Sequence, residues 1–452
     1  MSIKKQLGIT DPIQPSWHGL DVHIQATLLY RSWTVVAGGV TVLMIPLSMD
    51  AVEQGYFFTF ASILALQIFF ELGMGQVVVQ IVAHEAAYLR QGADGSYVGD
   101  AEHMARLTLL RAQLRRWYLP VALLFTLVVS GAGLVFFRDG GLAWGQWAPA
   151  WVSLVVATAI NLYSSWKMSI IEGFALVRNI AQLRLIQSVI GYVLMWAGLL
   201  SGAGLWVVVA VPLTTAVATS LWLEVSAASR VLQIRSNKPP VHPISWTRDI
   251  LPFQWRIAVS WISGYFIFQL FTPLVFRQFG AAEAGRLGLA MAIFSSISTI
   301  GLSWVNAKAP NMSMLIARRE SVVLLAQLKA VARPSLFFTT ALSGLVLLAA
   351  WGAMQFDLIL VQRISSLPAL ICIAAVTTTN CAIFSAAVFM RAHREEPMLT
   401  VSITSGLLTA IVVWYGSKYG AFEMMLGYAA VTILVALPWT MRLLHGYLVR
   451  YK

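Results

Sequence analysis

Long apolar runs recur along the whole chain, and none of them contains more than one charged residue. Only 11% of the 452 residues are charged and 58% are hydrophobic, whereas about 25% are charged in an average globular protein. This composition excludes a soluble globular domain, a disordered chain and a nucleic-acid-binding module, although the net charge is +12. Because the runs are continuous rather than alternating, they predict an all-α polytopic membrane protein and not a membrane β-barrel.

The apolar runs are long enough for about twelve transmembrane helices. The fifth and sixth are separated only by the turn Ser201-Gly202-Ala203-Gly204. The start of the chain lacks the apolar core of a signal peptide, so we expect the first run to act as the targeting signal and to stay in the protein. The expected spans are 27–47, 56–80, 117–137, 148–171, 185–201, 204–225, 252–275, 286–307, 335–356, 367–389, 398–416 and 420–441.

The distribution of Lys and Arg predicts the orientation. All but five of the 31 fall at the two ends of the chain or in one set of loops, counted with the span ends beside them; the exceptions are Arg138, Arg277, Arg286, Arg363 and Lys418. Since Lys and Arg accumulate in cytoplasmic loops, we expect a cell inner (plasma) membrane protein with both termini in the cytoplasm. The longest inner loop runs from about Ala83 to Arg116, and its second half places Leu107, Leu110, Leu114 and Trp117 on one helical face with arginines beside it. This predicts an amphipathic helix lying in the inner interface, or alternatively a basic loop that only sets the topology.

The two halves of the chain resemble each other. The stretch from Arg31 to Pro46 is similar to that from Arg256 to Pro273, and Pro149 to Asn161 has the same spacing as Pro368 to Asn380. Paired halves of six spans are typical of transporters. We therefore expect two pseudo-symmetric six-helix lobes around a central cavity. The expected divisions are a cytoplasmic segment at 1–26, an N-lobe at 27–229, a cytoplasmic linker at 230–248 and a C-lobe at 249–452.

Several short motifs accompany this arrangement: Glu53-Gln54-Gly55-Tyr56, Phe70-Glu71-Leu72-Gly73-Met74-Gly75, Glu172-Gly173-Phe174, Pro252-Phe253-Gln254-Trp255-Arg256 and Ser303-Trp304-Val305-Asn306-Ala307-Lys308-Ala309-Pro310. With twelve spans in two lobes, the chain resembles the O-antigen flippases of the multidrug/oligosaccharidyl-lipid/polysaccharide exporter superfamily. The resemblance implies a V-shaped cavity, alternating access and a cycle driven by a proton, another ion or the membrane potential. It also implies that the cargo is an undecaprenyl-diphosphate-linked oligosaccharide for lipopolysaccharide or another surface polysaccharide.

Ionisable residues at membrane depth are costly and indicate functional sites. Arg31 and Glu71 are expected at similar depths in the first two spans, and Arg256 at the matching depth of the seventh. Because guanidinium groups bind phosphate oxygens bidentately, Arg31, Arg256 and Lys308 are the candidate diphosphate-binding residues. Glu71 either pairs with Arg31 or carries a coupling proton. For Arg256 and Lys308 the alternative is snorkelling to the inner interface.

Polar residues inside the apolar runs are candidates for lining the cavity. They can hydrogen-bond sugar hydroxyls, or alternatively hold one helix to another. The set comprises Asn161, Gln269, Ser295, Thr299, Ser303 and Asn380. Cys372 and Cys381 lie too far apart along one helix for a disulfide, and with no metal-ligand spacing in the sequence we expect no metal or cofactor.

Two other functions are compatible with the composition. A multidrug exporter of the same superfamily would share the architecture, but those proteins characteristically carry acidic residues in cavity-facing spans where this chain has Arg31 and Arg256. A membrane polysaccharide polymerase or glycosyltransferase would need chemistry-bearing residues in sizeable outer loops. The outer loops here contain only scattered charges, with no carboxylate pair and no phosphate-binding loop. We therefore expect a transporter and not an enzyme.

Overall fold

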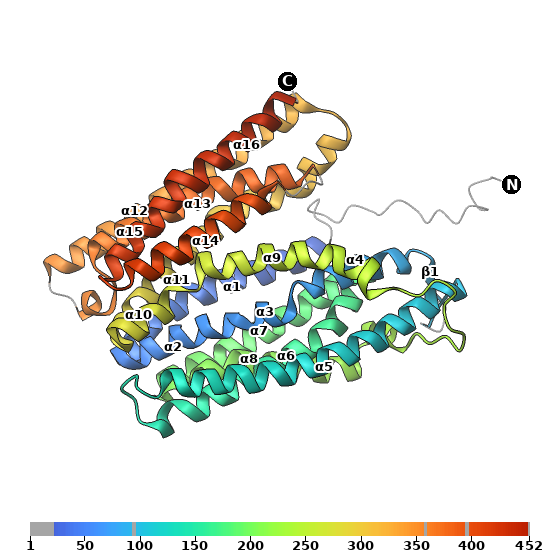
Figure 1. Ribbon diagram of the computed structural model, residues 1–452, viewed down its shortest axis with the longest axis horizontal. Coiled ribbons are helices and arrows are strands. Elements are labelled where there is room, and N and C mark those ends of the chain that lie inside the picture. The colour runs from blue at the N-terminus through green and yellow to red at the C-terminus, as the bar shows by residue number, and fades with distance from the viewer. Residues whose placement is uncertain (1–21, 93–95, 357–358, 394–396, 451–452) are drawn as a thin grey trace.

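The computed structural model describes residues 22–92, 96–356, 359–393 and 397–450, so most of the expected segment 1–26 lies outside the described residues. Within these ranges the chain forms long helices in two bundles (Figure 1). The described helices include 11 that are long and apolar enough to cross a membrane, or up to 12 if a bent pair counts as one span. The predicted all-α polytopic class is confirmed. Besides the helices, the structure contains a small antiparallel hairpin of Leu89–Gln91 (β1) and Tyr97–Gly99 (β2).

The first bundle contains the first eight α-helices. Within it, α7 packs against α1 and α8, and α6 packs against α5 and α8. The fifth and sixth predicted spans are confirmed as separate helices, α7 and α8. The helices are α1 (Val22–Ser48), α2 (Ala51–Leu64), α3 (Ile68–Glu71), α4 (Met74–Ala86), α5 (Ala101–Phe137), α6 (Trp144–Gly173), α7 (Val177–Leu200) and α8 (Val207–Val225), with 3₁₀ turns η2 (Ala65–Gln67), η3 (Gly204–Trp206) and η4 (Ala227–Gln233).

The second bundle contains the remaining helices, with α11 packed against α12 and α13, and α14 against α9 and α15. Cys372 and Cys381 are both buried and unbonded in α13, as the spacing predicts. The elements are η5 (Trp246–Ile250), α9 (Leu251–Phe268), α10 (Phe271–Phe279), α11 (Ala281–Ala317), α12 (Ser321–Gln355), η6 (Ile359–Arg363), α13 (Leu367–Arg391), α14 (Met398–Gly416), α15 (Ala421–Val431), η7 (Thr432–Ala436) and α16 (Leu437–Arg450).

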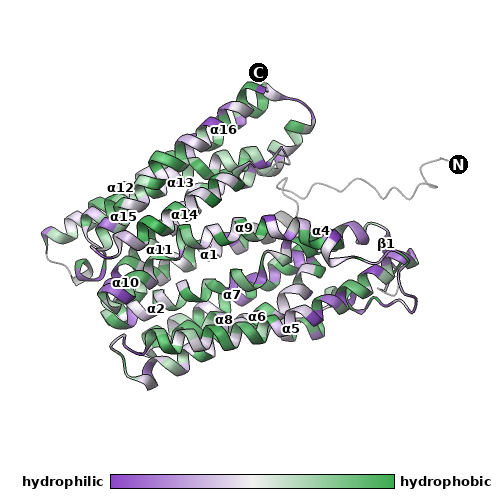
Figure 2. Cartoon of the chain, viewed as in Figure 1, coloured by the Kyte–Doolittle hydropathy of each residue, from purple (hydrophilic) through white to green (hydrophobic). Residues whose placement is uncertain are grey.

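The two bundles converge at one end and diverge toward the other (Figure 1). They touch where α2 and α1 meet α11 and where α3 and α4 meet α9. We call the converging end, with residues 49–55 and 280–288, the narrow end. We call the opposite end, with residues 86–101, 226–250 and 317–321, the basic end. Apolar residues dominate long stretches of α5, α12 and α13, and hydrophilic residues are frequent around α4 and β1 at the basic end (Figure 2).

Of the two alternatives for the second half of the inner loop 83–116, the helix lying in the interface is wrong. These residues continue without a break into the third span, so that α5 is a single helix of 37 residues. The face bearing Leu107, Leu110 and Leu114 is buried, and it packs in one core cluster with Ile234 and Ile244 from the segment between the bundles. The amphipathic pattern is real, but its apolar face is covered by a distant part of the chain rather than by lipid.

Two predicted spans are broken. The seventh bends by 40° between α9 and α10. The second breaks between α3 and α4, where Leu72 and Gly73 take left-handed backbone conformations with φ of 51° and 68°. Glycine adopts this conformation without a steric cost, and at Gly73 the missing side chain also leaves room for Ile257 of α9. The break therefore lies at a contact between the bundles.

Candidate substrate cavity between the bundles

The narrow end is closed by backbone packing between α2 and α11. A methyl group on Gly285 would lie 2.7 Å from the backbone nitrogen of Gly55, and one on Gly55 would overlap the carbonyl oxygen of Ala281. Beside this contact, Gln54 Nε2 donates hydrogen bonds to the carbonyl oxygens of Gly285 at 2.8 Å and Arg363 at 3.0 Å. Small residues allow helices to approach this closely, and we call Gln54, Gly55, Ala281 and Gly285 the narrow-end seal.

An aromatic contact extends the closure. Phe276 of α10 belongs to the second bundle but is buried among rings of the first. Its ring lies edge-on to Tyr56 with centroids 5.1 Å apart, and edge-on to Phe137 at 5.3 Å. Tyr56 in turn donates a hydrogen bond to the carbonyl oxygen of Phe137 at 3.0 Å. Edge-to-face pairs of this kind add to the energy of apolar burial, so the closed narrow end is held by both backbone and ring packing.

Two cavities lie on the basic side of the seal, on either side of α11. The first, of about 410 Å³, is lined by residues of α1, α2, α6, α7 and α8 together with Ala292, Ser295 and Ser296 of α11. The second, of about 340 Å³, is lined by α11, α13 and α15 together with Phe268 of α9, and Ser295 also lines it. Since helices of both bundles line the first cavity, it belongs to the space between them.

The three predicted cationic residues lie on helices that form the boundary between the bundles: Arg31 on α1, Arg256 on α9 and Lys308 on α11. All three side chains are exposed. Among the described residues none of them forms an ion pair. The Arg256 guanidinium lies 5.6 Å from the ring centroid of Trp255, and none of the three lines either cavity. In the described part of the chain these cations therefore have no acidic partner, and they are not gathered into one pocket.

One of the two alternatives for Glu71, an ion pair with Arg31, is not formed in this conformation, as far as the described residues show. Glu71 ends α3, directly before the break at Leu72 and Gly73. A methyl group on Gly75 would lie 3.1 Å from Glu71 Oε1 and 3.2 Å from the hydroxyl oxygen of Ser169 on α6. The carboxylate therefore lies beside α4 and close to Ser169 of α6, inside the first bundle, and is not directed at Arg31.

The predicted polar residues divide into two groups. Ser295, Thr299 and Asn380 line the cavity of about 340 Å³, where Asn380 Nδ2 donates to the hydroxyl of Tyr428 at 3.2 Å. Asn161, Gln269 and Ser303 line neither cavity. Asn161 Nδ2 donates to the carbonyl oxygen of Pro212 at 2.9 Å, so it joins α6 to α8, the alternative that the sequence left open.

The three residues outside the cavities have different positions. Gln269 is the last residue before the bend between α9 and α10. The Ser303 hydroxyl donates to the carbonyl oxygen of Ile300 within its own helix at 2.6 Å.

Sequence reasoning missed Gln54 as a functional candidate. A buried glutamine beside a glycine in an apolar run is the signal that could have found it, because a buried amide must find partners.

Comparison with known proteins shows which solved structures have a similar arrangement of helices. No protein-family model and no curated protein sequence matches the chain. Among solved structures, 93% of the chain aligns with 87% of the lipid II flippase MurJ in an inward closed conformation, at 14% identity and a TM-score of 0.59. An inward-facing multidrug resistance MATE transporter of the MOP superfamily aligns over 95% of this chain and 98% of its own, at 13% identity and a TM-score of 0.54.

A eukaryotic MATE transporter is also similar, with 14% identity and a TM-score of 0.55 over 94% of this chain and 97% of that one. At these identities the likeness concerns the arrangement of helices and not the residues of any site. It extends over nearly the whole chain and includes both bundles. The chain therefore has the fold of the multidrug/oligosaccharidyl-lipid/polysaccharide exporter (MOP) superfamily, a multi-pass membrane fold.

Proposed function

We propose that the protein flips an undecaprenyl-diphosphate-linked oligosaccharide from the cytoplasmic to the outer leaflet of the inner membrane, for O-antigen or another surface polysaccharide. The observation that carries the proposal is the pair of repeat-related arginines, Arg31 and Arg256, exposed and unpaired on the two equivalent helices α1 and α9 among the described residues. A guanidinium within the membrane that has no ion pair favours an anionic ligand, and a diphosphate offers oxygens that it can bind bidentately. A structure with this fold is a lipid II flippase, which supports a lipid cargo.

The geometry suits alternating access. In this conformation the bundles are closed at the narrow end and diverge at the basic end. If the basic end faces the cytoplasm, as the loop charges predict, the headgroup enters there and meets Arg31, Arg256 and Lys308, while the polyprenyl tail remains in the lipid. Rocking of the bundles then opens the narrow end. Ser295, Thr299 and Asn380, which line a cavity at α11, offer hydrogen bonds to the sugar.

Glu71 is proposed to couple the cycle to a proton or another cation. Its carboxylate lies inside the first bundle near Ser169, beside the break of the second span, and Gly75 leaves the space that it occupies. A change in its charge would act beside the place where α3 and α4 meet α9, and would therefore change the packing at the contact between the bundles. Glu71→Gln is expected to retain the fold but to lose the dependence of flipping on a proton gradient.

The test is reconstitution of the full chain into liposomes with a fluorescent polyprenyl-diphosphate oligosaccharide, whose transfer to the opposite leaflet is followed by quenching. Arg31→Ala and Arg256→Ala should each lower the flipping rate about tenfold or more, because one charged hydrogen-bond partner of phosphate contributes roughly 1.5–3 kcal/mol. Arg277→Ala removes an exposed arginine of α10 near the narrow end and is the matched control. Full flipping by both Arg31→Ala and Arg256→Ala would contradict the proposed headgroup site.

A multidrug exporter is the second candidate, because two of the similar structures are MATE transporters. It predicts that cells without the protein become sensitive to organic cations and accumulate no lipid-linked sugar. The proposed flippase predicts the opposite pair of results, accumulation of undecaprenyl-linked oligosaccharide inside the cell with unchanged drug sensitivity. Loss of the gene in its own host therefore separates the two candidates in one comparison.

A further inference from the structure

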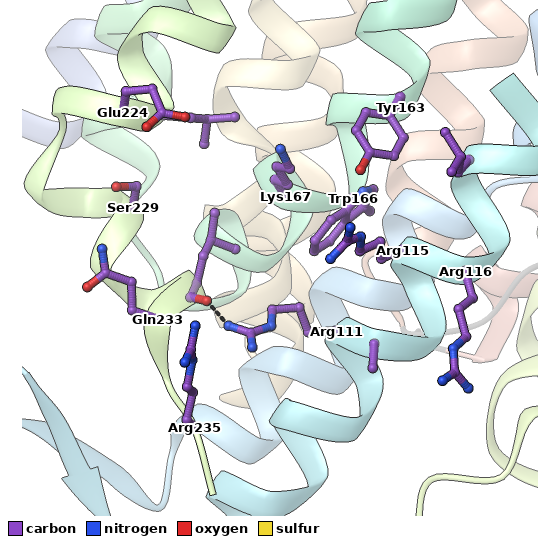
Figure 3. Close-up of a pocket in the computed structure, with 14 residues that line it drawn as sticks. Arg111, Arg115, Arg116, Tyr163, Trp166, Lys167, Glu224, Ser229, Gln233 and Arg235 are labelled. Carbon is purple, nitrogen blue, oxygen red and sulfur yellow. Dashed lines mark hydrogen bonds between the residues drawn. The ribbon is translucent and has the colours of Figure 1, made fainter.

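A basic pocket lies inside the first bundle at its basic end, apart from the space between the bundles. It has a volume of about 720 Å³ and lies among α5, α6, α8 and the segment that follows α8. Arg111, Arg115, Lys167 and Arg235 line it, and the guanidinium groups of Arg111 and Arg235 face each other (Figure 3). Lys167 points away from them, with its Nζ 5.4 Å from the ring centroid of Tyr163, and Arg116 is directed away at the edge of the pocket. These four cations come from three separate parts of the chain, so the fold gathers like charges that the sequence keeps apart.

These charges are poorly compensated. Among the described residues none of the four forms an ion pair, and the single acidic residue that lines the pocket, Glu224, is exposed at its rim. Arg111 donates a hydrogen bond to the carbonyl oxygen of Leu232, which holds it in place close to the charges of Arg115 and Arg235. Like charges held together repel one another, and a bound anion would remove that repulsion.

An apolar surface adjoins the pocket on two helices. On α5, Arg111 and Arg115 are followed at the same four-residue spacing by Leu119 and Leu123, which are exposed. Residues four apart share one face of a helix, so this face changes from basic to apolar toward the middle of the span. On α6, exposed Val156 and Ile160 precede Tyr163 and Lys167 on one face in the same way. Both helices therefore present apolar side chains beside the cationic pocket.

The cationic pocket and the apolar surface beside it together indicate the chemical class of the ligand. A pocket lined by four cations suits a phosphate group, and arginine is especially suited to bind its oxygens. The adjoining apolar faces of α5 and α6 suit acyl chains at the depth of one leaflet. A soluble phosphate compound would use only the first of these features. We propose that this pocket binds the phosphate headgroup of an anionic phospholipid, whose acyl chains lie along α5 and α6.

The pocket also includes the segment between the bundles. Ser229, Leu232, Gln233 and Arg235 line it from that segment, while the remaining walls belong to the transmembrane helices. A lipid headgroup bound there would join the beginning of the segment to α5 and α6. The site is independent of the proposed cargo site, because none of Arg31, Arg256 and Lys308 lines it.

The experiment measures the unfolding midpoint of the full chain in detergent as phosphatidylglycerol, phosphatidylcholine or glycerol phosphate is added. Phosphatidylglycerol is expected to raise the midpoint, since a ligand that binds only the folded state stabilises it. The double variant Arg115→Gln with Lys167→Gln should bind it at least about tenfold more weakly. The matched control is Arg333→Gln with Lys329→Gln, which removes one exposed Arg and one exposed Lys from α12. The single variant Arg235→Gln repeats the test should the double variant fold poorly.

The proposal is supported if phosphatidylglycerol stabilises the native chain and the control pair, and stabilises the pocket variants much less. It is overturned if phosphatidylcholine stabilises the chain equally, if pocket and control variants respond alike, or if glycerol phosphate at the same concentration has the same effect as the lipid. Retained flipping of the polyprenyl-linked cargo by the pocket variants would distinguish this site from the headgroup site at Arg31 and Arg256.

Discussion

Adding single methyl groups at the narrow-end seal should shift the protein toward the conformation that is open at that end. In Gly285→Ala the new carbon would lie 2.7 Å from the nitrogen of Gly55 and 3.1 Å from the carbonyl oxygen of Ala51, whereas ordinary contact begins at 3.4 Å. Both neighbours are backbone atoms that cannot rotate away. The two helices must therefore separate by about 0.7 Å, or the contact must open.

The magnitude follows from the cost of overpacking, which is roughly 1–3 kcal/mol for an added methylene in a packed site. Only the closed narrow end bears this cost, so the ratio of open to closed molecules should rise by about 5- to 150-fold. Gly55→Ala should have the larger effect, because its methyl group would overlap the carbonyl oxygen of Ala281. Gly131→Ala in α5 is the control, since a methyl group there would meet nothing within 4 Å.

The assay is the distance between spin labels at Asp139 and Lys418, measured by pulsed electron spin resonance. Both positions are exposed and lie in narrow-end loops, one in each bundle. Cys372 and Cys381 are replaced by Ala so that only these sites are labelled. The long-distance population should grow in the order Gly131→Ala, Gly285→Ala, Gly55→Ala. If all three variants give the same distribution, close backbone packing is not what keeps the narrow end shut.

Three further substitutions test other contacts. Gln54→Ala removes two hydrogen bonds between the bundles, at 2.8 and 3.0 Å, and should enlarge the same long-distance population at a cost of about 0.5–1.5 kcal/mol per bond. Glu85→Gln leaves Arg106, now 3.1 Å from the buried carboxylate, without a counter-charge, so the unfolding midpoint should fall by an amount equivalent to about 3–5 kcal/mol. Asn161→Ala loses the bond to Pro212 and should reduce thermal stability by about 1 kcal/mol while the flipping rate stays unchanged, which a sugar-binding role for Asn161 would contradict.

The membrane-crossing part of the fold could be predicted because bilayer thickness sets the length of an apolar run. Hydropathy gives no information on where a helix continues outside the lipid, and α5, α11 and α12 all extend beyond their apolar runs toward the basic end. Residues 101–117 illustrate the difficulty. Their amphipathic pattern shows that one face is covered, but only the tertiary structure shows that residues 226–250 cover it.

The site was harder to predict than the fold, because the relevant contacts join distant residues. Arg111, Arg115 and Arg235 look like ordinary cytoplasmic loop charges in the sequence, and their convergence depends on the return of the chain after α8. Similarly, Arg31 and Glu71 are expected at comparable depths along their helices, but Glu71 ends α3 directly before the break at Leu72 and Gly73, which the sequence did not predict. Depth can be counted along a sequence, whereas direction around a helix changes at such a break.

The seal also bears on how the two halves can move. Gly55 of α2 and Gly285 of α11 meet at the seal, so their contact joins one helix of each bundle. The reinforcing contacts are not symmetric. Gln54 reaches from the first bundle into the second, whereas Phe276 reaches from the second into the first. Opening the narrow end must therefore break two different interactions at once, one polar and one apolar. Neither Gln54 nor Phe276 is itself titratable, so an ion that drives opening has to act elsewhere in the molecule. The proposed site of that charge change, Glu71, lies beside the contact of α3 and α4 with α9.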